Sequence, residues 1–347
     1  MGRGAWLALT AAIALILCGC TAGSRSEDSA GPVVESSRAT ETPTATPLGD
    51  PDRLLTFAVV THGTAGDSFW DVVKTGAEDA GAADNIEIDY QADPEPGGQA
   101  QLIDAATSSQ VDGLIVSMPD PDALQESIAR AEAAGIPVVT IDAGEERSAE
   151  FGALTHVGQS AASVGEGAGV RLREAGVTKL LCVIHEAGNV SLEERCQGAA
   201  LGLGANPSGG DVEDVMHTMR VNASNIAVTE TTIASELRTD PEIDGVLTLN
   251  PAVADAAAAA IEAAGSAAML ATFDVNADVF QGIRNGQILF AVDQQQYLQG
   301  YLPVVFLALY ARNGNVVGGG QPVPTGPRYI TVENVDSVED LASNGTR

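Results

Sequence analysis

The feature that most constrains the fold of this chain is a regular alternation of short apolar runs with longer amphipathic segments from residue 55 onward. Continuous apolar runs of four to eight residues are typical of strands that are buried on both faces. The segments between them repeat their apolar residues with the 3.6-residue period of a helix. This pattern predicts parallel α/β sheets with right-handed crossovers between neighbouring strands.

The number of expected strands is too large for one small sheet, so we expect two α/β lobes. The predicted strands are 56–61, 87–91, 113–117, 137–141, 179–184, 211–216, 245–249, 269–273 and 288–292. The clearest predicted helices are 68–83, 122–134, 161–175, 223–238 and 252–264. Gly135, Gly176 and Gly265 stand at the ends of helical patterns, where glycine commonly terminates a helix.

The first residues have the pattern of a targeting segment. Arg3 precedes an apolar run over 5–17, which is too short to span a bilayer comfortably and suits a signal peptide. The run ends in Leu17-Cys18-Gly19-Cys20, which resembles a bacterial lipobox. The resemblance implies a signal peptide over 1–19 and lipidation of Cys20. An ordinary cleaved signal with incidental cysteines is the alternative.

Residues 20–53 are expected to form a flexible tether. The stretch is rich in Ser, Thr, Pro and acidic residues and has almost no large apolar side chains. Such a composition cannot bury enough apolar surface to offset the entropy of ordering. Together with a lipid at Cys20, it predicts an extracytoplasmic protein that is anchored to the cell membrane and does not span it.

The charge of the chain excludes several classes of function. There are 47 Asp and Glu residues against 17 Lys and Arg residues, for a net charge of −30. No basic stripe can form, which argues against nucleic-acid binding and against attraction of the folded part to anionic lipids. Acidity of this size keeps a protein soluble, and we expect a monomer.

Two cysteines remain in the body of the chain. Cys182 lies in a predicted strand and Cys196 early in the next helix, so a disulfide between them is possible outside the cytoplasm. Two buried thiols are the alternative. The four histidines, at 62, 156, 185 and 217, show no metal-ligand spacing. We therefore predict no metal site and no cofactor.

Polar side chains follow nearly every predicted strand. Ligands of parallel α/β sheets bind beyond the carboxyl ends of the strands. Each of these residues alone is explained more simply by helix capping or turn formation. As a set, they suit a ligand with many hydroxyls, because carboxylates and amides can each bind adjacent hydroxyls and aromatic rings can stack on a sugar. The polar positions are His62, Asp67, Ser68, Asp120, Asp142, His185, Glu186, Asn250, Asp274, Asp293, Gln294 and Gln295, and the aromatic pair is Phe69 and Trp70.

The order of these motifs resembles that of the type I periplasmic binding proteins, and among them the ribose-binding-like sugar receptors of ABC transporters. The resemblance covers about residues 54–335. It rests on Ser68-Phe69-Trp70, on Asp112-Gly113-Leu114-Ile115-Val116 leading to Pro119-Asp120, on the stretch 134–142, on Arg195-Cys196-Gln197-Gly198, and on Asn250, Phe273-Asp274 and Gln294.

This resemblance implies two lobes that are joined by three chain crossings and close on a monosaccharide or polyol. Lobe 1 would comprise 54–157 and 295–326, and lobe 2 would comprise 158–294 and 327–347. The implied partner is the permease of an ABC importer. The implied ligand contacts are Asp67, Ser68, Phe69, Trp70, Asp120, Asp142, Arg195, Asn250, Asp274 and Gln294.

Three departures from the ribose-binding pattern concern the ligand. Asp67 stands where ribose binders have Asn, Ala143 follows Asp142 in place of Arg, and Glu193 replaces the first Arg of its helix. These departures argue against ribose itself. They leave open a neutral hexose or inositol, and also an amino sugar or amino polyol whose ammonium would offset the carboxylates.

Other functions fit the sequence less well. There is no nucleophile elbow, no P-loop and no metal-ligand cluster, so no enzyme is predicted. The glycines of 165–169 lie inside a helical pattern, which favours close helix packing over a dinucleotide-binding loop. A sugar-responsive transcription factor would need an N-terminal DNA-reading helix pair. A receptor that presents its ligand to a sensor kinase or chemoreceptor is the closer alternative, because its body would look the same.

Overall fold

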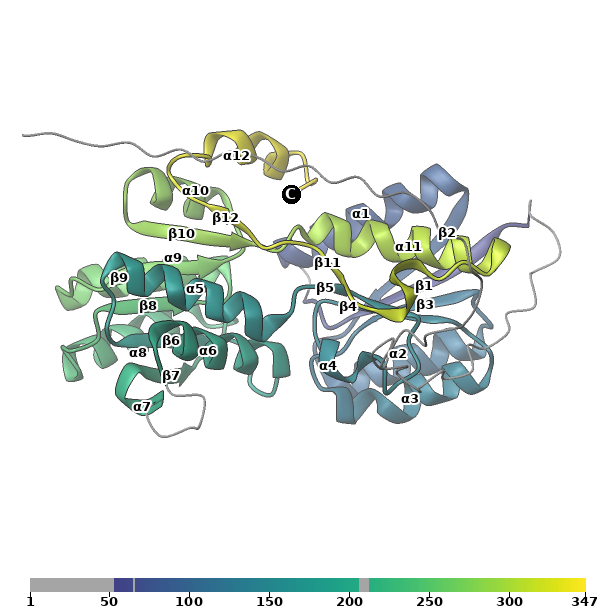
Figure 1. The fold of residues 1–347 in the computed structure, drawn as a ribbon, viewed down its shortest axis with the longest axis horizontal. Coiled ribbons are helices and arrows are strands. Elements are labelled where there is room, and N and C mark those ends of the chain that lie inside the picture. The colour runs from purple at the N-terminus through teal and green to yellow at the C-terminus, as the bar shows by residue number, and fades with distance from the viewer. Residues whose placement is uncertain (1–52, 65, 206–211) are drawn as a thin grey trace, which may run out of the picture. The chain divides into compact units, whose positions relative to one another are not determined.

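The computed structural model describes residues 53–64, 66–205 and 212–347. The predicted signal peptide, Cys20 and nearly all of the predicted tether lie outside the described residues. The described part contains two α/β lobes, each built on a six-stranded sheet (Figure 1). The predicted fold class is thus confirmed.

The first lobe is a fully parallel sheet in the order β11-β5-β4-β3-β1-β2. Helices α1 and α11 pack on one face and α2 and α3 on the other. Its strands are β1 Leu55–Thr61, β2 Ile86–Ala92, β3 Gly113–Ser117, β4 Val138–Ile141, β5 Thr155–Gly158 and β11 Val323–Pro324. Its helices are α1 Ser68–Asp84, α2 Pro96–Ser108, α3 Pro121–Ala133, α4 Glu145–Ser148, α11 Gln296–Asn313 and the 3₁₀ turn Val317–Gly320.

The second lobe repeats this arrangement in the order β12-β10-β9-β8-β6-β7, and only β12 runs antiparallel to its neighbour. Helices α5 and α6 cover one face, and α8, α9, α10 and α12 cover the other. Its strands are β6 Leu180–Ile184, β7 Met216–Arg220, β8 Gly245–Thr248, β9 Met269–Phe273, β10 Ile288–Asp293 and β12 Arg328–Ile330. Its helices are α5 Ala161–Ala175, α6 Val190–Leu203, α7 Val212–Val215, α8 Ile226–Thr239, α9 Pro251–Ala264, α10 Ala277–Arg284 and α12 Asp336–Ser343.

Each sheet separates two hydrophobic clusters, one under each helical layer. The central strands β3, β4, β6 and β8 are buried along their whole length, as strands covered on both faces must be. Disregarding β11 and β12, both sheets have the doubly wound order 2-1-3-4-5. Ligands bind such sheets at the carboxyl ends of the strands, near the point where the order reverses.

Two predicted elements differ from the structure. The prediction of a strand over 211–216 is wrong for Val212–Val215, because these residues form helix α7. The observed strand, β7, begins only at Met216. The reason is that β7 is an edge strand with partly exposed residues, so no continuous apolar run marks it. Strand β5 was not predicted, because its buried residues include Thr155 and His156 and it therefore lacks an apolar run.

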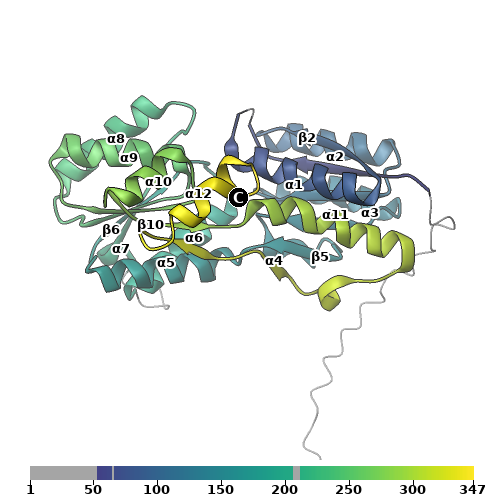
Figure 2. The same cartoon turned by 90° about the horizontal axis from the view of Figure 1, so that it is seen from above.

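The chain passes between the two sheets after β5, after β10 and between β11 and β12, and these crossings can be followed in Figure 2. The three crossings touch one another. Gln159 Nε2 donates a hydrogen bond to the Asp293 carbonyl oxygen at 3.4 Å. A Cβ on Gly326, whose φ is +129°, would lie 2.7 Å from Gln159 Nε2 and 3.0 Å from that oxygen. The residue boundaries of the lobes stay a prediction.

Glycines let α5 and α6 pack backbone to backbone. A Cβ at Gly165 would collide with the carbonyl oxygen of Arg195, and one at Gly169 with that of Ala199. The prediction that the glycines of 165–169 serve close helix packing is confirmed for these two. Among the described residues, no helix is both long enough and apolar enough to cross a membrane.

Candidate ligand-binding site

A cavity of about 830 Å³ is lined by residues that follow strands of both sheets. This volume lies within the range of about 300–1,000 Å³ that is usual for small-molecule sites. The lining includes four carboxylates, and no Lys or Arg is among its described residues. Lining side chains with polar groups are His62, Thr64, Asp67, Ser68, Glu95, Asp120, His185, Glu186, Asn189, Asn222, Ser224, Asn250 and Asn276.

Four of the predicted ligand residues line this cavity, and three of these four cap helices. Asp67 accepts from Phe69 N at 2.9 Å, Asp120 accepts from Ala123 N at 3.1 Å, and Asn250 accepts from Ala252 N at 2.9 Å. Capping, the simpler interpretation, therefore holds for all three. Each cap hydrogen bond uses one side-chain oxygen, which leaves the second polar atom of the side chain for other partners. Ser68, the fourth, is exposed.

Four further predicted residues form a buried polar cluster, which we call the inner cluster: Asp142, Arg195, Asp274 and Gln294. One Arg195 guanidinium nitrogen donates to Gln294 Oε1 at 2.6 Å and lies 3.9 Å from Asp142 Oδ1. Gln294 Nε2 lies 3.1 and 3.0 Å from the two carboxylate oxygens of Asp274. The inner cluster thus joins the ends of β4, β9 and β10 to helix α6.

Burial dominates the electrostatics of the inner cluster. It raises the pKa of Asp274 to about 8, against the opposing effects of Arg195 and the Gln294 hydrogen bond. It also raises the pKa of Asp142, and the neighbouring Arg195 partly offsets this rise. The Arg195 guanidinium lies 4.8 Å from the centre of the Phe273 ring, and its Nε has no hydrogen-bond partner within the described part of the chain.

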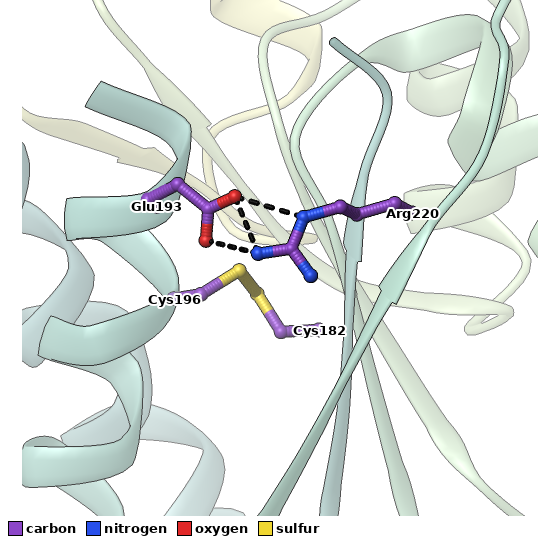
Figure 3. The surroundings of a disulfide bond; sticks show 4 residues. All are labelled: Cys182, Glu193, Cys196 and Arg220. Atoms are coloured by element: carbon purple, nitrogen blue, oxygen red, sulfur yellow. Dashed lines mark hydrogen bonds and ion pairs between the residues drawn. A yellow bond between two sulfur atoms is a disulfide. The ribbon is translucent and has the colours of Figure 1, made fainter. Parts of the chain in front are cut away.

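Helix α6 is held in place on both sides of Arg195. Cys196, the next residue, forms a disulfide with Cys182 of β6, with an S–S distance of 2.02 Å. Glu193 accepts from Arg220, at the end of β7, through two nitrogens at 3.0 and 2.6 Å. Figure 3 shows this ion pair beside the disulfide. Glu193, which replaces an Arg of the ribose-binding pattern, is thus engaged by a neighbouring strand.

The predicted aromatic pair lies behind the cavity. Phe69 and Trp70 belong to the buried core of the first lobe, and neither is among the residues that line the cavity. The two rings meet edge to face with centroids 4.9 Å apart, and Trp70 contacts the His62 ring at 4.7 Å. In this conformation the aromatic residues support His62, and a stacking contact with a ligand stays a prediction.

The structure adds polar residues that were not selected as ligand contacts. His62 follows β1, Glu186 follows β6, and Asn189 caps α6. His62 Nε2 lies 3.6 Å from Glu186 Oε2 and 3.9 Å from Asp142 Oδ2, so it connects the cavity to the inner cluster. Their positions at strand ends were visible in the sequence. Asn189 offered only a capping signal, because nothing local indicates that it faces His62.

The site does not have the composition of a metal centre. Within the described ranges, no group of three or more His, Cys, Asp or Glu side chains is arranged to hold a metal ion. Burial lowers the pKa of His62 and of His185 to about 4, so both rings are neutral at pH 7. What the arrangement offers is a set of hydrogen-bond acceptors and donors around a cavity, which suits recognition of a small polar molecule.

A cavity at the carboxyl ends of two doubly wound sheets, joined by three chain crossings, defines a two-lobed ligand-binding protein. Residues 57–315 match the family model described as a periplasmic binding protein domain. The chain therefore belongs to the periplasmic binding protein family, and its two lobes have the type I fold of that family.

Similar solved structures and a curated relative agree with this assignment. A carbohydrate transporter from Acidothermus cellulolyticus, solved with myo-inositol, is 41% identical with a TM-score of 0.80, and the match covers 85% of this chain and 100% of that one. An ABC transporter solute-binding protein from Burkholderia graminis, solved with D-arabinose, is 22% identical with a TM-score of 0.72 over 82% and 98% of the two chains, and shows the fold alone.

The xylose/arabinose-binding protein of Sulfolobus acidocaldarius is 24% identical over 251 residues. The match spans 67% of this chain and 60% of the length of that relative. The family and these relatives are binding and transport proteins, so the chain is a binding protein and not an enzyme. Family membership also implies a location outside the cytoplasm.

Proposed function

We propose that this protein captures a monosaccharide or polyol between its lobes and delivers it, as a monomer, to the permease of an ABC importer. The observation that carries the proposal is that Asp142, Arg195, Asp274 and Gln294 form one buried cluster. His62 connects this cluster to a cavity that has no Lys or Arg among its described lining residues. The relative solved with myo-inositol makes that cyclitol the first ligand to test.

The proposed ligand contacts are those predicted from the sequence: the cavity residues Asp67, Ser68, Asp120 and Asn250, the inner cluster, and Phe69 and Trp70 after a local rearrangement. Closure of the lobes would remove water from these polar groups. A buried donor or acceptor that the ligand leaves unpaired costs about 1–3 kcal/mol, so a hydroxyl in the wrong place is rejected. This cost is the physical basis for selectivity among sugars of equal size.

A ligand screen tests the proposal. The purified protein is mixed with monosaccharides, inositols and amino sugars, and its thermal unfolding is followed. A ligand at 100 times its Kd stabilises the folded state by about 2.7 kcal/mol through mass action, which is a clear upward shift of the Tm. The absence of a shift with every compound would contradict the proposed function.

Variants of the inner cluster test the location of the site. We expect Asp274→Ala and Arg195→Ala each to weaken binding of the best ligand by at least about tenfold, which corresponds to 1.4 kcal/mol. Asp278→Ala is the matched control, because Asp278 is exposed on α10 in the same lobe. Titration calorimetry measures the affinities. Equal affinity of both inner-cluster variants and the control would place the ligand elsewhere.

We further propose that a lipid at Cys20 anchors the protein to the cell membrane. Support comes from the lipobox-like motif Leu17-Cys18-Gly19-Cys20 and from the polar, acidic composition of the stretch that follows it. Cys20→Ala is expected to release the protein from the membrane fraction into the soluble fraction, while Cys18→Ala, two residues earlier, is the matched control. Membrane attachment of the Cys20 variant would refute the lipid anchor.

A further inference from the structure

We infer that His62 selects a hydroxyl group at one position of the ligand and rejects an ammonium group there. This inference rests on the proposed function and deepens it, since the sequence leaves both a neutral polyol and an amino polyol open. It follows from the hydrogen-bond pattern around the imidazole ring, which determines which ring nitrogen carries the proton.

The hydroxyl group of Ser117, at the end of β3, contacts the His62 ring. Its oxygen accepts from the backbone N–H of His62 at 3.2 Å and lies 3.4 Å from Gln99 Nε2, whose shorter bond, at 2.7 Å, goes to the Ser117 carbonyl oxygen. Both nitrogens can only donate, so neither can take the hydroxyl hydrogen of Ser117. The hydroxyl hydrogen is then left to donate to His62 Nδ1, which lies 2.7 Å away.

The hydrogen bond with Ser117 fixes the tautomer of the His62 ring. Because His62 Nδ1 accepts from Ser117, the single proton of the neutral ring resides on Nε2. The ring is neutral because its side chain is only 6% exposed, and burial lowers its pKa to about 4. His62 therefore presents an Nε2–H donor at a cavity wall.

Among the described residues, no side-chain acceptor lies within normal hydrogen-bond distance of this Nε2–H. Asn189 Nδ2 lies 3.5 Å from His62 Nε2, a contact that would be a hydrogen bond only if Nε2 were unprotonated. The orientation of this amide is set by its other bonds, because its Oδ1 accepts from Ser191 N at 3.1 Å and its Nδ2 donates to Glu186 Oε2 at 2.9 Å. A donor thus faces a donor. The carboxylate oxygens of Glu186 and Asp142, at 3.6 and 3.9 Å, are beyond normal hydrogen-bond distance.

The two N–H groups, on His62 Nε2 and Asn189 Nδ2, need a ligand group that accepts from both. A hydroxyl oxygen can accept from both His62 Nε2 and Asn189 Nδ2, and its hydrogen can go to the carboxylate of Asp142 or Glu186. An ammonium group can donate to these carboxylates, but it has no lone pair for the two N–H groups. The acidic surroundings alone would attract a cation, and the two donors oppose one at this position.

A nitrogen-15 NMR experiment on the intact, labelled protein tests the tautomer without any ligand. We expect the His62 ring, assigned by comparison with His62→Gln, to show a protonated Nε2 and an unprotonated Nδ1. In Ser117→Ala the Nδ1–H form should become populated, while His217, an exposed residue paired with Glu236, should keep its signals. A His62 ring protonated on Nδ1 in the unmodified protein would overturn the inference.

A calorimetric series tests the contact itself, with myo-inositol and its monodeoxy and monoamino analogues as probes. We expect one deoxy analogue, and the amino analogue at the same carbon, to bind at least about tenfold more weakly than myo-inositol. His62→Ala should weaken binding of myo-inositol by a similar factor and leave the affinity of that deoxy analogue unchanged. His62→Gln, which keeps an amide donor, should lose less, and thermal unfolding verifies that both variants fold.

The outcomes separate this inference from the proposed function. One outcome is that myo-inositol binds but His62→Ala weakens the binding of every deoxy analogue as much as that of myo-inositol. Another is that the amino analogues bind as well as myo-inositol. In either case the inference fails and the proposed function stands. If none of these polyols and no sugar in the ligand screen binds to the protein, the proposed function fails and this inference fails with it.

Discussion

At the scale of single residues, the two buried aspartates occupy corresponding places in the two lobes. Asp142 follows β4 with φ of +59°, and Asp274 follows β9 with φ of +62°. Non-glycine residues in this left-handed region are strained by about 1–3 kcal/mol and persist where the surrounding structure holds them, often at ligand sites. Both carboxylates are also almost fully buried. Strain and desolvation in the same two residues support a binding role.

Asp274 should make the stability of the protein depend on pH. Its pKa is raised from 3.8 to about 8 in the folded chain. Between about pH 4 and pH 8, the folded state therefore keeps a proton that the unfolded state releases. The stability that this group contributes is complete below about pH 4 and is lost as the pH rises through about 8. We expect the Tm of the unmodified protein minus that of Asp274→Asn to decrease between about pH 5 and pH 8. Asp278→Asn, at an exposed residue of the same lobe, is the matched control. A constant difference for Asp274→Asn would contradict the raised pKa.

At the scale of elements, helix α6 decides where Arg195 lies. The disulfide to Cys182 holds the helix to β6, and the Glu193–Arg220 ion pair holds it to β7 (Figure 3). The glycine contacts pack it closely against α5. These three attachments differ in strength. The disulfide is buried, whereas Arg220 is about half exposed and its ion pair is correspondingly screened by solvent.

The disulfide and the ion pair should therefore differ in their contribution to stability. Cys182 and Cys196 are 14 positions apart, and closing a loop of that size stabilises the folded state by about 3 kcal/mol. We expect Cys182→Ala with Cys196→Ala to lower the free energy of unfolding by about that amount in urea titrations. Arg220→Met should cost at most about 1 kcal/mol. An equal loss in both variants would mean that the disulfide adds little.

The glycine contacts between α5 and α6 lead to a second prediction at this scale. A methyl group at position 169 would collide with the Ala199 carbonyl, which is backbone and cannot turn away. We expect Gly169→Ala to lower the free energy of unfolding by about 1–3 kcal/mol. Gly167→Ala, on the same helix, meets only the hydroxyl end of the Tyr329 side chain and should be nearly neutral. Chemical denaturation compares the two, and a harmless Gly169→Ala would refute the close packing.

At the scale of the whole molecule, the crossings between the lobes carry a buried charge. Asp293 ends β10, is fully buried, and accepts from Gln295 N at 2.8 Å. Its other oxygen pairs with the Arg347 guanidinium, at 2.7 Å from each of two nitrogens. Helix α12, which precedes this arginine, is tied to the second lobe by ion pairs of Arg284 with Asp336 and Glu339. The segment after α12 is thus attached to a chain crossing.

Removing the charge of Arg347 should destabilise the protein through Asp293. A buried carboxylate that loses its partner typically costs about 3–5 kcal/mol. We expect Arg347→Met to lower the free energy of unfolding by about 3 kcal/mol, as measured by chemical denaturation. Adding Asp293→Asn should restore most of the loss, because the amide oxygen can still accept from Gln295 N. No recovery in the double variant would show that the arginine acts by packing and not by charge.

Much of the fold could be predicted because its signals are local. Strands Gly113–Ser117 and Met269–Phe273 and helix Ala161–Ala175 lie at the predicted residues, since their apolar periodicity depends only on neighbours in the chain. The short buried strand Thr155–Gly158 escaped prediction because its polar residues find partners in other segments. His156 Nδ1, for example, lies 2.9 Å from Thr140 Oγ1.

The chain's own pattern of apolar runs, helix ends and polar strand ends was enough to predict the fold class and to nominate Asp142, Asp274 and Gln294. It could not show that Phe69 and Trp70 pack behind His62, or that His62 faces Asn189, 127 positions away. The physical reason is the range of the interactions. Periodicity and capping act over a few residues, whereas the buried network joins side chains such as Arg195 and Gln294, 99 positions apart, which meet only when the strands are assembled into sheets.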